Sequence, residues 1–137
     1  MKKWRLYLIC LLGILQLPIL AAPKENKENT EETKRIYMYG IAIDFNDSTV
    51  YLTDVQYLDS IVMKPDGSIH NLSGYSLQLR VYLEDQLNET NQTCAVIYSD
   101  KKRKLEKRFS ATRRKFQYDK SKTIKLIGTD DFVFQKR

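Results

Sequence analysis

Histidine, cysteine and tryptophan are scarce in this chain of 137 residues, which has one histidine, two cysteines and one tryptophan. A single histidine, His70, cannot form the paired-ligand spacing of a zinc site, so no metal is expected. Because Cys10 lies in an apolar N-terminal stretch that we expect to be removed, Cys94 stands alone and no internal disulfide is expected. The run TCAVIY around Cys94 is apolar, which favours a small core residue over a reactive thiol.

The common catalytic motifs are also missing. The sequence contains no nucleophile elbow, no glycine-rich phosphate loop and no paired-ligand spacing. Asp44, Asp47, Asp54 and Asp59 are spread through one predicted hairpin, where solvated strand edges explain them better than acid–base catalysis. A small secreted enzyme built around Cys94 or these aspartates is therefore the least favoured functional interpretation. No catalytic residue and no cofactor is predicted.

The N-terminus has the pattern of a secretory signal peptide. Three basic residues within the first five precede residues 6–22, which carry no charge and end in small side chains. An uncleaved anchor is the alternative, but a spanning helix needs about 20 apolar residues, and this stretch is shorter and contains a glutamine and a proline. We predict that residues 1–22 are a signal peptide cleaved after Ala21 or Ala22. No transmembrane helix is then expected in the mature protein.

The remaining chain divides into a tether and one domain. Residues 23–34 contain almost no apolar side chain and are predicted to be a flexible polar tether. Residues 35–137 are enough for one domain with its own core. Apolar residues alternate over 35–45, a turn follows at 46–48, and a second strand is predicted to complete a β-hairpin. Residues 56–63 either extend that second strand past a bulge or form a separate short strand.

Turn and helix signals continue the pattern. The run KPDGS at 64–68 is a turn, and Ser73 is the predicted N-cap of a helix that stops near Asn88. An apolar strand at 93–98 and a basic helix come next, and the runs TIKLI and DFVF supply one or two closing strands. The predicted order is ββαβαβ. It indicates a small α+β domain with a mixed or antiparallel sheet and both helices on one face.

Positive charge is concentrated in one segment of an otherwise acidic protein. Residues 24–100 hold 6 basic and 13 acidic side chains, a net charge of −7, whereas residues 101–125 hold 12 basic and 2 acidic side chains, a net charge of +10. The basic segment includes the run CAVIYSDKKRKLEKRFSATRRKF. Its chemistry therefore differs from that of the rest of the chain.

Two interpretations of this basic segment are open. Leu105, Phe109, Thr112 and Phe116 recur at helical spacing, which is typical of a helix packed on a sheet, so the cations between them could simply form a solvated face. However, residues 101–104 are four consecutive cations in the first turn, where the helix dipole already presents positive charge. An anion bound at this position would resolve the conflict, because exposed helix N–H groups and lysines both attract anions.

The sequence thus predicts a non-catalytic binding module that contacts an anionic partner. The candidate anion-binding residues are Lys101, Lys102, Arg103, Lys104, Lys107 and Arg108. The partners that fit an exported protein are an anionic, phosphorylated glycolipid, an acidic polysaccharide or an acidic protein surface. Nucleic acid is not expected, because no recognition motif or paired aromatic platform is present. The alternative is a structural subunit that docks on a partner envelope protein through the same helix.

Four stretches also carry a resemblance to a known group of proteins: YGIAIDFNDSTVYLTDVQYLDS, YSLQLRVYLED, QTCAVIYSDKKRKLEKRF and RRKF. They resemble the small exported proteins of unknown function that are abundant in Bacteroidota. The resemblance covers most of residues 36–134 and is specific to that group rather than to any activity. It implies a protein of the periplasm or cell envelope of a Gram-negative bacterium, with no assigned catalytic residues.

Overall fold

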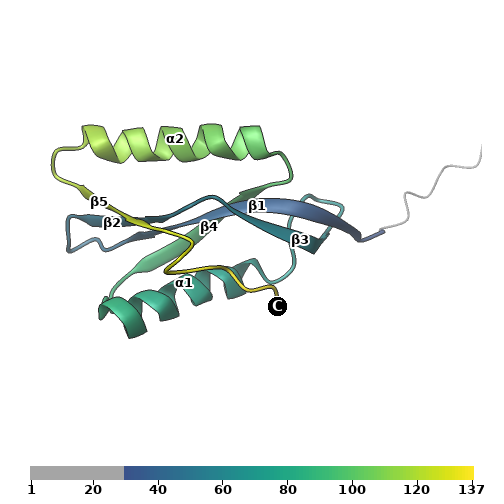
Figure 1. Cartoon of the computed structure of the whole chain (residues 1–137), viewed down its shortest axis with the longest axis horizontal. Helices are drawn as coiled ribbons and strands as arrows, with labels where there is room; N and C mark the ends of the chain where they lie inside the picture. Colours follow the sequence, from purple (N-terminus) through teal and green to yellow (C-terminus); the bar gives the residue numbers. More distant parts are fainter. Residues whose placement is uncertain (1–29) are drawn as a thin grey trace, which may run out of the picture.

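The chain folds into a mixed β-sheet with one helix on each face (Figure 1). The computed structural model describes residues 30–137, so the predicted signal peptide and most of the predicted tether lie outside the described residues. In chain order the elements are β1 (Glu32–Ile43), β2 (Thr49–Thr53), β3 (Gln56–Met63), α1 (Leu72–Leu87), β4 (Thr93–Ser99), α2 (Lys102–Tyr118) and β5 (Thr123–Ile127). Strand β5 pairs parallel with β2, and the strands that pair with β1 are antiparallel to it. The predicted α+β class with a mixed sheet is confirmed.

Strands β2 and β3 act as one long strand that bulges in the middle. Both pair with the edge of β1 that lies opposite β4. Ile41 pairs with Leu52 and Met38 pairs with Gln56, so three steps along β1 correspond to four steps along its neighbour, which defines a β-bulge. A second shift lies at Ser60, whose φ is 55°. Strand β3 therefore extends β2 past a bulge, and the sheet order is β4, β1, β2 with β3, then β5.

The two helices cover opposite faces of the sheet, which corrects the prediction that they share one face (Figure 1). Adjacent residues of β1 belong to different cores: Met38 packs on the α1 side and Tyr39 on the α2 side, and both are buried. The crossover from β3 through α1 to β4 runs one way across the sheet, and the crossover from β4 through α2 to β5 runs back. Two such crossovers have the same hand only when their helices lie on opposite faces, and one hand strongly dominates in proteins.

The C-terminal segment after β5 closes the α1-side core without forming a strand. Phe132 and Phe134 meet edge to face, with ring centroids 4.9 Å apart, and both are buried against α1. The buried Gln56 side chain donates from Nε2 to the Phe132 carbonyl at 3.0 Å and accepts the Phe134 N–H at Oε1, at 2.8 Å. This amide supplies the bonds that a neighbouring strand would supply. Of the one or two closing strands predicted, β5 forms and DFVF does not.

The element ends differ from prediction in two places. Asn71, with φ of 55°, is the N-cap of α1, and Ser73 lies within the first turn, so the predicted N-cap was wrong. The predicted end at Asn88 is confirmed, because this residue adopts φ of 55° and its N–H bonds back to the last turn. Strand β1 begins at Glu32, which pairs with the end of β3, so the last three residues of the predicted tether belong to the sheet.

Candidate functional site

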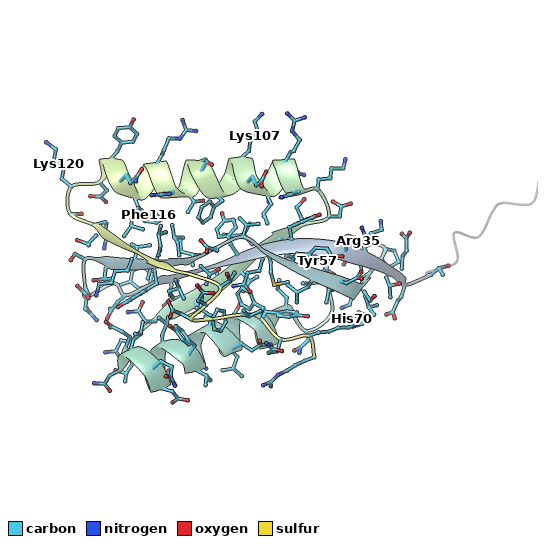
Figure 2. All side chains as sticks on the ribbon, in the orientation of Figure 1. Arg35, Tyr57, His70, Lys107, Phe116 and Lys120 are labelled. Atoms are coloured by element: carbon cyan, nitrogen blue, oxygen red, sulfur yellow. The ribbon has the colours of Figure 1, made fainter. Side chains whose placement is uncertain are left out.

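Contacts with the sheet fix the rotation of helix α2 and leave its basic side in solvent. Leu105 is fully buried in the α2-side core. Phe109 meets Tyr39 edge to face, with ring centroids 5.2 Å apart and planes at 77°. The Tyr39 hydroxyl and Thr112 Oγ1 are hydrogen-bonded at 3.0 Å. Figure 2 shows Phe116 pointing from α2 toward the sheet. The predicted packing stripe is confirmed.

A row of cations runs along α2 on the side opposite this stripe. Arg103, Lys107 and Arg114 recur at i, i+4 and i+11, with Ser110 between the last two. All four are exposed, and Figure 2 shows Lys107 pointing away from the sheet. They line one open hollow, to which Lys104 and the carboxylate Glu106 also contribute. We call Arg103, Lys107 and Arg114 the cation ridge.

The other cations of α2 lie on its two flanks. Arg108 lines a second hollow together with Val96–Tyr98 of β4. Lys104 and Lys115 lie four residues before it and seven residues after it, so they share this flank of the helix. We call Lys104, Arg108 and Lys115 the β4-side flank. By the same helical geometry, Arg113 lies on the opposite flank.

Little negative charge compensates these cations. The single carboxylate of α2, Glu106, lies 3.8 Å from the ammonium of Lys102. The Lys115 ammonium lies 5.9 Å from the ring centroid of Phe116. Across residues 30–137, no carboxylate comes within ion-pair distance of the cation ridge or of Arg108. Within residues 30–137 the ridge therefore presents an excess of positive charge to solvent, with Glu106, which also pairs with Lys102, as the one carboxylate in the hollow.

The first turn of α2 places cations at the positive end of the helix dipole, as the sequence indicates. Lys101 is the N-cap, with extended backbone (φ −107°, ψ 109°), and its own side chain makes no capping hydrogen bond. Ser99 Oγ accepts the Lys101 N–H at 3.1 Å. Because Lys101 precedes the helix, this bond does not reach the N–H groups of the first helical turn. The first turn contains no acidic residue. Its cations, residues 101–104, are exposed at the positive end of the helix dipole.

The six predicted residues are all exposed, but the structure divides them. Arg103, Lys104 and Lys107 line the same hollow, whereas Arg108 faces β4 and Lys102 is engaged by a carboxylate. Sequence reasoning missed Arg114, which continues the ridge, and Lys115, which continues the β4-side flank. The signal was present in the sequence, because each lies seven residues after a residue that was predicted, Lys107 and Arg108 respectively.

A Cys–His dyad is ruled out by distance. The backbone N–H of His70 donates to the carbonyl of Val62, and Val62 pairs with Thr33 of β1. Cys94 pairs with Ala42, at the other end of the same strand. The strand between these two positions spans about 30 Å. Cys94 is half-buried rather than part of the core, and burial raises the pKa of its thiol to about 11, which suppresses the thiolate that a nucleophile requires.

Three of the hairpin aspartates bond to backbone N–H groups close by in the chain, at a turn or at the bulge of β3. Asp44 and Asp59 each accept a backbone N–H, at 2.8 Å, from a residue that follows closely in the chain. The Ser48 N–H donates to Asp47 and is the main reason that the pKa of this carboxyl is lowered. Within residues 30–137, no three His, Cys, Asp or Glu side chains gather closely enough to hold a metal ion. No helix in that range is long and apolar enough to span a membrane.

Comparisons of the chain with protein-family models, with curated proteins and with solved structures found no match. Its function must therefore be inferred from its own residues. The excess of cations on α2 is the feature with the clearest chemistry, because a basic surface of this kind attracts anions.

Proposed function

We propose that the protein is a non-catalytic binding module of a Gram-negative cell envelope that contacts an anionic partner through α2. The cation ridge carries this proposal. Arg103, Lys107 and Arg114 are exposed, line one hollow and have no carboxylate within ion-pair distance in the described part of the chain. Export is supported by the uncharged residues 6–22 behind a basic head.

An anionic partner would relieve unfavourable electrostatics that the folded chain retains. Like charges at i and i+4, such as Arg103 and Lys107, destabilise a helix by a few tenths of a kcal/mol per pair. The cations at the start of α2 oppose the helix dipole, and no acidic residue in the first turn offsets them. A solvated face would more often mix charges of both signs, whereas α2 holds one carboxylate among its many cations.

The shape of the ridge favours an extended partner with repeated negative charges. The helix rises about 16 Å between Arg103 and Arg114. The hollow that these residues line is open, so it does not enclose a small ligand. A polymer or surface with repeated acidic groups could contact the whole ridge, as acidic polysaccharide, clustered phosphorylated glycolipid head groups or an acidic protein surface would.

A comparison of two triple variants tests the proposal. The ridge variant replaces Arg103, Lys107 and Arg114 by glutamine. The control variant removes the same amount of charge at three exposed cations outside α2: Lys64, Lys136 and Arg137. Binding is measured to alginate, to long-chain polyphosphate and to vesicles that contain a phosphorylated glycolipid, at several salt concentrations.

We expect the wild type and the control variant to bind at least one of these probes, with affinity that falls as salt rises. The ridge variant should bind about ten-fold more weakly or worse, because it loses three ionic contacts of up to about 1 kcal/mol each. Equal losses in the two variants would show that net charge matters and the ridge does not. Absence of binding by the wild type to every probe, the acidic peptides described below included, would refute the proposal.

A further inference from the structure

Strand β4 has one edge without a backbone partner in the described part of the chain. On its other edge all seven residues pair with β1, from Thr93↔Ile43 to Ser99↔Tyr37, without a register shift. In an antiparallel strand, only alternate residues direct their N–H and C=O groups to a given neighbour. The remaining groups of β4 therefore point outward, where no other strand or backbone hydrogen bond within residues 30–137 meets them.

This edge also lacks the features that normally prevent a further strand from pairing. Natural proteins protect edge strands with charged residues, proline, bulges or short length. Strand β5, at the opposite edge of the sheet, has five residues and contains Lys125. Strand β3 bulges at Ser60. The sequence of β4, TCAVIYS, contains no charged residue, no proline and no glycine.

The surroundings of the free edge are open on both sides. One hollow lies where Thr93 and Cys94 meet α1, and Arg80 is part of its lining. The other lies where Val96–Tyr98 approach α2, and its lining includes Arg108 and, from the turn before α1, Gly67. Side chains of an added strand would point alternately toward these two sides. The edge thus has a helix above and below it (Figure 1), and near Tyr98 it is bordered by the turn that contains Gly67, whose carbonyl accepts a hydrogen bond from the Tyr98 hydroxyl at 3.1 Å.

The charges beside the edge identify the kind of strand that fits. On the α2 side the β4-side flank of Lys104, Arg108 and Lys115 carries no carboxylate. On the α1 side Arg80 lies 3.8 Å from Glu84, so that side is close to neutral. An extended segment with acidic side chains facing α2 and small or apolar side chains facing α1 would complement both sides.

We propose that β4 accepts an extended, acidic peptide segment of another protein as an additional strand of the sheet. Backbone hydrogen bonds to β4 would supply affinity, and carboxylates of the segment would contact the β4-side flank of α2. This inference rests on the proposed function, because α2 again supplies the positive charge, here from the β4-side flank beside the cation ridge. It adds that the anionic partner is a polypeptide and that its main chain is recognised.

A second copy of this chain fits the edge less well. An antiparallel pair of β4 strands across a two-fold axis would place the two α2 helices on the same face of the joined sheet. Their β4-side flanks would then face each other across the junction with charge of one sign. Like charges in such an interface oppose association. The edge is therefore selective for a strand of opposite charge.

The first test uses three fluorescein-labelled peptides of alternating glutamate and valine, equal in length to β4. One is unmodified, and the other two are N-methylated at one or the other set of alternate amides. An added strand directs only one set toward β4, so one methylated peptide should bind at least about ten-fold more weakly while the other binds like the parent. Equal binding by all three peptides would overturn the inference, since binding by charge alone does not require the peptide N–H groups.

A pair of single variants tests the contribution of α2. Arg108→Gln should weaken binding of the unmodified peptide about two- to five-fold, whereas Arg113→Gln, on the opposite flank of the same helix, should leave it unchanged. Hydrogen exchange should show that the peptide protects amides of residues 93–99 in the wild-type protein. Protection confined to α2 would overturn the inference.

The remaining outcomes separate this inference from the proposed function. If alginate binds and the three peptides do not differ, the inference fails and the proposed function stands. If no polyanion and no peptide binds, both fail. If the protein alone forms a concentration-dependent dimer in which residues 93–99 are protected, the edge is used but the occupant is a second copy, which overturns the choice of an acidic partner strand.

Discussion

Replacing Gln56 by methionine should release the C-terminal segment from the sheet. The Gln56 side chain is 5% exposed and makes two hydrogen bonds to the backbone, one at 3.0 Å to the Phe132 carbonyl and one at 2.8 Å from the Phe134 N–H. Methionine has a similar length and volume, so the substitution leaves no large cavity. It removes the amide alone and leaves both backbone groups buried without a partner.

The magnitude follows from those two groups. A buried backbone group without a partner costs roughly 1–3 kcal/mol, so the variant should lose about 2–4 kcal/mol of unfolding free energy once some local relaxation is included. That is a large part of the roughly 5–15 kcal/mol that stabilises a typical domain. The segment also contributes two buried aromatic rings to the α1-side core, so its release would weaken the packing of α1.

The chain contains a matched control for this substitution. Gln78 of α1 makes the same pair of bonds with Gln135, donating to its carbonyl at 2.8 Å and accepting its N–H at 2.7 Å, but these bonds are exposed to solvent. Water can replace these bonds, so Gln78→Met should cost less than about 1 kcal/mol. Urea unfolding followed by circular dichroism measures both variants. Similar losses in the two, or a loss below about 1 kcal/mol for Gln56→Met, would refute the reasoning.

Three further predictions concern helix α2 and the free cysteine. Leu105→Ala should lower the unfolding free energy by roughly 2–5 kcal/mol, because it leaves a cavity beneath α2; an unchanged melting temperature would contradict the observed packing. A double variant with glutamate at Lys101 and Lys104 should gain about 0.3–1 kcal/mol per favourable site at low salt while losing polyanion binding, as measured by paired thermal melts and binding assays; Lys102 is kept because it pairs with Glu106. Burial raises the pKa of Cys94 from 9.0 to about 11. The contribution of the neutral thiol to the unfolding free energy should therefore be complete below pH 9 and lost as the pH rises toward 11. The difference in unfolding free energy between wild type and Cys94→Ser should change over that interval and not below it.

Local patterns in the sequence were enough to predict the hairpin and the orientation of α2. The packing stripe from Leu105 to Phe116 repeats within a single helix, so periodicity alone locates the buried side. The same periodicity, extended by two turns, would have located Arg114 on the cation ridge. The candidate site was largely predictable, because it is the solvent side of one regular element.

The features that the sequence did not predict depend on contacts between distant residues. The helices lie on opposite faces because of the direction of two crossovers, and β1 is buried on both faces, so Met38 and Tyr39 show no alternation of apolar and polar character. The run DFVF has the composition of a strand, but Gln56, far away in the sequence, satisfies its backbone. Strand β1 begins in a polar segment because Glu32 pairs with the end of β3. No apolar pattern in the sequence predicts this pairing.

The position of Phe132 and Phe134 makes the α1-side core depend on contacts between distant parts of the chain. Their rings pack against α1, and their backbone groups bond to the Gln56 side chain across 76 and 78 residues of sequence. Closing so long a loop costs conformational entropy before the contact is gained, and contacts of high sequence separation slow folding. The α1-side core should therefore be completed late in folding, after α1 and the strands beneath it have formed.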